Sequence, residues 1–176
     1  MKQTFLSLIL LLSINCFAQS HECLTLADLL KLGPMTEAAK IEEVVKPAGY
    51  TFTVENAGSL AFSGTTMSML NVKKTEGGQS TVEFNMEHGN CFNDIIKQLE
   101  SAGFKKDFKW EAGLASSNGY ESEDKGLYMF TSKKFTEVDG KKIEGTTYIC
   151  TILNKIDYLK KKELYKSNPK ITITEF

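Results

Sequence analysis

The chain has 176 residues, with 21 basic residues against 22 acidic ones and a formal net charge of −1 at pH 7. Every basic residue is a lysine, so the chain lacks the guanidinium fork with which arginine binds phosphate, carboxylate and guanine. This composition and the near-neutral charge argue against a nucleic-acid-binding protein. The length predicts a single domain with a well-formed core.

The first 19 residues have the pattern of a secretory signal peptide. A short basic head precedes an apolar run over residues 5–14, and small residues end at Ala18. The run is shorter than the roughly 20 residues that a membrane-spanning helix needs. We expect cleavage after Ala18, or after Gln19 as the alternative, and a periplasmic or secreted protein. Lipoprotein processing at Cys16 is disfavoured, because the residues before it fit that processing poorly.

The first half of the mature chain predicts two helices followed by four strands. Leucines at short spacing favour a helix that Gly33 and Pro34 end, and apolar residues at helical spacing favour a second helix that Pro47 ends. The residues that follow alternate between apolar and polar, as strands do. The predicted helices span residues 23–32 and 37–45, and the strands span residues 50–55, 60–62, 66–73 and 79–86, the last two forming a hairpin around Gly77 and Gly78.

The second half predicts a similar series. A helix opens at Asn90 or Cys91 and closes at Gly103, because its apolar residues recur at helical spacing. A weak strand at 108–110 precedes a Gly/Ser-rich acidic loop at 112–125. A clearer hairpin joins residues 127–135 and 145–153 through the Asp139-Gly140 turn. A helix at 156–165 and a strand at 171–176 complete the chain.

These elements predict an α+β fold, with an antiparallel sheet of about six strands and two or three helices packed on one face. The other face of the sheet is expected to be partly open, as binding surfaces often are. Residues 20–176 form the single domain. The two halves also suggest a degenerate helix-strand-hairpin duplication with pseudo-repeats at 23–89 and 91–153 and a C-terminal extension at 154–176. Each pseudo-repeat has an Ala-Gly-aromatic step, which ends at Tyr50 or Phe104.

Three cysteines remain after the predicted cleavage, which in an oxidising compartment favours one disulfide and one free thiol. Cys150 lies in an apolar strand, where a thiol packs like a small hydrophobe. This favours a Cys23–Cys91 disulfide over Cys91–Cys150. The favoured bond closes a loop of about 68 residues and contributes about 4 kcal/mol.

No combination of residues predicts a catalytic or metal site strongly. His21 and Cys23 with His88 and Cys91 are four zinc-type ligands, but their spacing is not a common zinc pattern, and a disulfide between the cysteines excludes it. Cys91 beside His88 is the one local nucleophile–base pair, and the same disulfide removes its nucleophile. We therefore expect no catalytic residues, no metal and no cofactor.

The remaining candidates are aromatic and acidic side chains around the predicted loop at 112–125. Trp110 and Tyr120 flank this loop and are expected to be exposed contact residues. The acidic side chains Glu121, Glu123 and Asp124 are expected to contact the same partner. The sequence thus favours an exported, non-catalytic binding protein for another protein, such as an inhibitor or an immunity-type protein. The alternatives are a carrier of a small apolar ligand, held between helices and sheet, and a Cys/His hydrolase.

Overall fold

The structure is a computed structural model that describes residues 23–75 and 80–176. The predicted signal peptide at 1–19 and the predicted Gly77-Gly78 turn lie outside the described residues. The described part contains no helix of the length and apolarity that a bilayer crossing requires.

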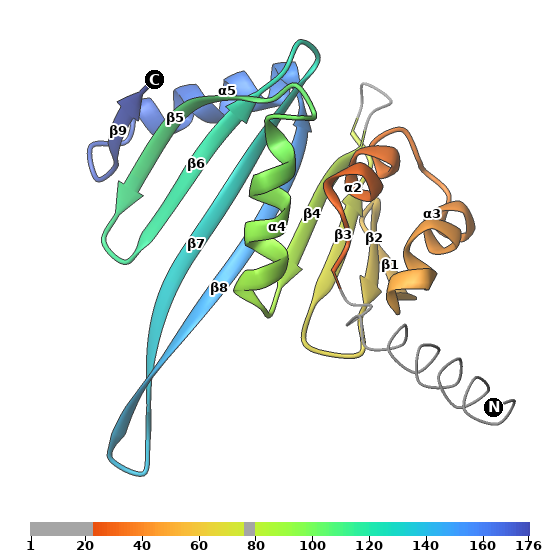
Figure 1. Cartoon of the computed structure of the whole chain (residues 1–176), viewed down its shortest axis with the longest axis horizontal. Helices are drawn as coiled ribbons and strands as arrows, with labels where there is room; N and C mark the ends of the chain where they lie inside the picture. The colour runs from red at the N-terminus through yellow and green to blue at the C-terminus, as the bar shows by residue number, and fades with distance from the viewer. Residues whose placement is uncertain (1–22, 76–79) are drawn as a thin grey trace, which may run out of the picture.

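The described chain forms one antiparallel sheet of nine strands, in the order β1-β2-β3-β4-β8-β7-β6-β5-β9 (Figure 1). Strands β1 to β4 and strands β5 to β8 are two meanders of neighbouring hairpins, which meet where β4 pairs with β8. The strands are β1 (Thr51–Asn56), β2 (Ser59–Ser63), β3 (Met69–Lys73), β4 (Thr81–Met86), β5 (Lys105–Ala112), β6 (Ala115–Glu121), β7 (Lys125–Val138), β8 (Lys141–Asn154) and β9 (Thr172–Glu175).

The described helices are α2 (Leu26–Leu32), α3 (Ala38–Val45), α4 (Gly89–Leu99) and α5 (Lys155–Lys166), with a short 3-10 helix at Lys46–Ala48. Side chains cap two of them. Thr25 and Asp28 form a capping box at the start of α2. Asn154 accepts a hydrogen bond of 2.9 Å from the backbone N–H of Asp157 at the start of α5. These caps fix where α2 and α5 begin.

The larger core lies between α2, α3 and α4 and one face of the sheet. Alternate residues of the central strands point into it, among them Phe84 on β4, Cys150 on β8 and Met129 on β7. Leu29 from α2, Ile41 from α3 and Ile95 from α4 cover them, and all six side chains are buried. Strand alternation therefore gives this face of the sheet its continuous apolar layer.

Three helices, α2, α3 and α4, pack on one face of the sheet as expected, but α5 covers the face that was expected to be partly open (Figure 1). Tyr128 and Leu153 alternate with the residues of the first core and pack with Tyr158 of α5 in a second, smaller core. Gly126 allows this approach, since a Cβ at that position would overlap the Tyr158 ring. The sequence pattern of α5 did not indicate which face it covers.

The expected count of about six strands is also too low. The stretch at 112–125 predicted as a loop contains β6, whose small residues pair with β5 on one side and β7 on the other. Small polar residues are poor strand formers by composition, but here both neighbours supply the hydrogen bonds and the packing. The predicted α+β class is confirmed.

The two halves share local geometry at their Ala-Gly-aromatic steps. Gly49 and Gly103 both have a positive φ, of 84° and 79°. In both steps the next residue, Tyr50 or Phe104, is buried and donates its backbone N–H to a carbonyl five residues back. The strand that follows has a register irregularity three to five residues after the glycine in both halves. The duplication stays a prediction, and these correspondences favour it.

Candidate functional site

Helix α5 is attached to the sheet by its inner side. The Tyr158 hydroxyl donates to Asp107 Oδ2 at 2.9 Å, and Lys162 Nζ lies 2.7 and 2.8 Å from the two oxygens of the same carboxylate. Tyr128 donates its hydroxyl to the Tyr158 carbonyl at 2.9 Å. Burial, and then the bond to Asp107, raise the pKa of Tyr158 far above its ordinary value. These contacts fix how α5 is rotated about its axis.

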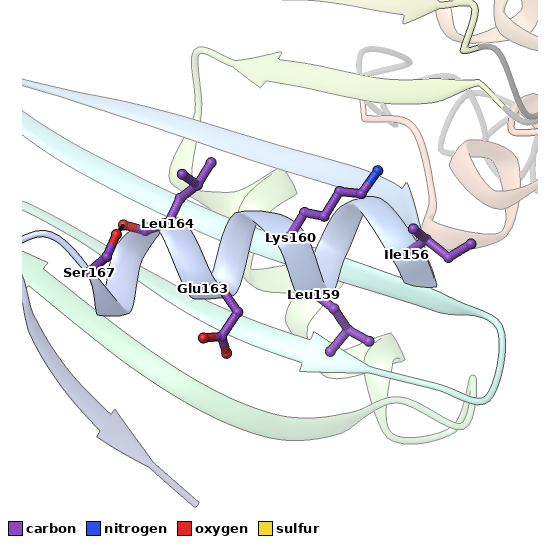
Figure 2. A pocket seen from close by; sticks show the side chains of 6 residues that line it. All are labelled: Ile156, Leu159, Lys160, Glu163, Leu164 and Ser167. Carbon is purple, nitrogen blue, oxygen red and sulfur yellow. Dashed lines mark hydrogen bonds between the residues drawn. The ribbon is translucent and has the colours of Figure 1, made fainter.

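That rotation directs a row of apolar side chains away from the sheet. Ile156, Leu159 and Leu164 are 67%, 43% and 68% exposed. They line one shallow, open depression together with Lys160 and Glu163 (Figure 2). We call these five residues the outer stripe of α5. Their spacing places them on one side of the helix, and clustered exposed aliphatic residues of this kind mark interaction surfaces.

A second exposed element is the far end of the β7–β8 hairpin. In the described chain, β6 pairs with β7 only as far as Ser132, and β4 pairs with β8 only from Tyr148. Between these positions the two strands pair only with each other, and the hairpin projects beyond the sheet (Figure 1). We call this part the arm. Its turn has positive φ at Asp139 and Gly140, of 51° and 72°, as a two-residue hairpin turn requires.

The arm is covered by no other described part of the protein. Every residue from 133 to 145 whose burial is described is exposed, including Phe135 and Ile143. Lys133 and Glu144 form an ion pair at 2.6 Å, and Lys142 lies 4.1 Å from the centre of the Phe135 ring. Exposed contacts of this kind contribute little stability.

The two predicted aromatic contact residues do not come together. Trp110 is only 7% exposed and faces α5, where its ring centre lies 5.1 Å from that of Tyr165. Tyr120 is half-buried and packs against the core on the other face of the sheet. The expectation that Trp110 is exposed is therefore wrong, because the chain around it is a strand within a sheet and not the edge of a loop.

The predicted acidic residues lie beside the start of α5. Glu121 forms an ion pair of 2.6 Å with Lys155, and the Asp124 carbonyl accepts from the Lys155 backbone N–H at 3.0 Å. The hydrogen bond from Lys125 lowers the pKa of Asp124. Glu123 is exposed. Glu121 and Asp124 thus support the helix end from which the outer stripe begins.

The predicted disulfide is present: Cys23 and Cys91 are bonded, with 5.2 Å between their Cα atoms. Cys91 therefore has no free thiol and cannot act as the nucleophile of a Cys/His pair. Cys150 is buried opposite Phe84, and burial raises the pKa of its thiol. No group of three or more potential metal ligands occurs among residues 23–75 and 80–176.

Comparisons with models of protein families, with curated protein sequences and with solved structures find no match to this chain. The outer stripe was missed by reasoning from the sequence. Its signal is present nevertheless, because Ile156, Leu159 and Leu164 lie on the opposite side of an ideal helix from Tyr158 and Tyr165. A single core cannot bury both sides of this helix, so one of them must stay exposed.

Proposed function

We propose that this protein is an exported, non-catalytic binding protein whose partner is another protein, such as an inhibitor or an immunity-type protein. The outer stripe of α5 carries this proposal. Three aliphatic side chains point away from the only core that α5 contacts in the described chain, and the partly buried hydrogen bonds of Asp107 with Tyr158 and Lys162 hold them there.

The stripe has the composition of a contact surface on a protein. Leu159 lies between Ile156 and Leu164, with Lys160 and Glu163 beside it. Lys160 lies 3.9 Å from Asp157, and Glu163 lies 3.6 Å from Lys166, so both charges are satisfied within the helix. A partner therefore gains apolar burial at the centre without leaving a charge unpaired at the rim. We expect it to present an apolar groove with a polar border.

Export is supported by two independent features. The first 19 residues have the signal-peptide pattern, and the mature part carries a disulfide between cysteines 68 residues apart. Disulfides persist in oxidising compartments and are rare in reducing ones. A partner is accordingly expected in the periplasm or outside the cell.

The experiment compares the parent protein with a Leu159→Lys/Leu164→Lys variant in capture from the envelope and culture medium of the host. The matched control is Met67→Lys/Leu114→Lys, which adds the same two charges at exposed apolar residues away from α5. We expect one stoichiometric protein that the parent and the control retain and the α5 variant loses. Equal capture by all three, or a parent that only self-associates in sedimentation, would refute the proposal.

A further inference from the structure

A groove on the α5 face of the sheet is separate from the outer stripe. It has a volume of about 300 Å³ and is lined by residues of β4 to β8 and by the inner side of α5. Four aromatic side chains contribute to its walls, namely Trp110, Tyr128, Phe130 and Tyr165. The Trp110 ring centre lies 5.8 Å from that of Phe130 and 5.1 Å from that of Tyr165. A planar or aliphatic body of modest size fits this composition.

Two polar atoms of the groove residues lack partners. Trp110 Nε1 and Ser117 Oγ are buried and have no hydrogen-bond partner among the described residues. The two residues are 7% and 2% exposed and are directly opposed on β5 and β6. Opposed residues on one face of a sheet have neighbouring side chains. Buried polar groups are nearly always satisfied, so this pair indicates a missing hydrogen-bonding partner.

A lysine without a carboxylate partner also lines the groove. The other four lysines of α5 each form an ion pair, whereas Lys161 has none within the described chain. Its ammonium lies 5.1 Å from the centre of the Tyr128 ring. Tyr128 is on β7, which pairs with the strand of Ser117. Burial lowers the pKa of Lys161. Glu83 also lines the groove, but its carboxylate is beyond ion-pair distance and its charge opposes this lowering only in part. An anion in the groove would offset that cost.

We propose that the groove binds a small aromatic carboxylic acid. The indole N–H of Trp110 and the hydroxyl of Ser117 donate to its carboxylate, and the ammonium of Lys161 supplies the opposite charge. The ring of the acid packs against Phe130 and Ile149. This binding site is independent of the protein partner proposed above, since it uses the inner side of α5.

Trp110 is the only tryptophan of the chain, so its fluorescence reports on the groove directly. The test titrates the protein with phenylacetate and with 2-phenylethanol, which has a similar body and no charge. We expect a saturable change with phenylacetate and binding at least about tenfold weaker with 2-phenylethanol. Lys161→Gln should weaken phenylacetate binding by about tenfold and Ser117→Ala by several-fold, with urea unfolding confirming that both variants fold.

The matched control is Lys160→Gln, on the outer side of the same helix, which should bind phenylacetate as the parent does. The Leu159→Lys/Leu164→Lys variant should also keep this binding, so loss of a protein partner and loss of the acid are distinguishable. The proposal is overturned if the Trp110 fluorescence shows no saturable change up to about 10 mM phenylacetate. That result is expected of a groove that holds only water. It is equally overturned if both compounds bind alike or if Lys160→Gln acts like Lys161→Gln.

Discussion

A Cys23→Ala/Cys91→Ala double substitution tests how much the disulfide between the segment before α2 and helix α4 stabilises the fold. The bond joins residues that are 68 positions apart. In the chain-entropy model a closed loop of this length corresponds to about 4 kcal/mol at 25 °C. Alanine keeps a small apolar side chain at Cys91, which is buried, so little cavity cost is added. We therefore expect the free energy of unfolding to fall by about 4 kcal/mol.

Urea unfolding at equilibrium measures this fall, with the parent protein in reductant as the internal control. The reduced parent should unfold at the same urea concentration as the double variant. Peptide mapping of the oxidised parent should find Cys23 bonded to Cys91, and Cys150 should react with a thiol reagent only after unfolding, because it is fully buried. A loss below about 1 kcal/mol would show that the disulfide does not stabilise the fold in this way, and Cys150 in a disulfide would contradict the Cys23–Cys91 pairing.

Three further predictions concern the packing of α5. Gly126→Ala should lower the free energy of unfolding by about 2 kcal/mol or more, because its Cβ overlaps Tyr158, whereas Gly145→Ala in the arm should change it by less than about 1 kcal/mol. Asp107→Asn should cost about 2 kcal/mol in the same urea assay, because it leaves the mostly buried Lys162 with only the exposed Glu175 as an ion-pair partner; unchanged stability would contradict this. Burial raises the pKa of both Tyr128 and Tyr158 in the folded state. The contribution of the two neutral tyrosines to the free energy of unfolding is therefore complete below the unfolded pKa of about 10. It is lost as the pH rises above that value, by about 1.4 kcal/mol per pH unit for each tyrosine. Urea unfolding at a series of pH values between 8 and 11.5 measures this loss, and a flat profile would contradict it.

The sequence predicted the elements of the fold better than their arrangement. Helical spacing located α4, and alternation with a turn located the β3–β4 and β7–β8 hairpins, because these patterns are local. Strand β6 was missed because Ser116, Ser117 and Gly119 have weak strand preference and are held by β5 and β7. The face that α5 covers depends on Gly126 and Tyr158, which lie far apart in sequence and meet only in the fold.

In the candidate sites too, features set by nearby residues were predicted, and features set by distant strands were not. The Cys23–Cys91 bond followed from compartment and from the apolar setting of Cys150, both of which are readable locally. Trp110 was predicted to be exposed and is buried, because burial on a sheet depends on the strands that flank it. No local pattern pairs Trp110 with Ser117, since their juxtaposition depends on the β5–β6 register.

The position of β8 has a consequence for the order in which the chain folds. This strand joins the two meanders and carries Cys150, yet it follows Cys23 and Cys91 in the chain. If the chain is exported from its N-terminus, as we propose, these two cysteines emerge first and their bond can close before the third thiol arrives. When β8 then adds to β4, it encloses Cys150 between the halves. The late central strand thus completes the sheet and also prevents the odd thiol from exchanging with the finished disulfide.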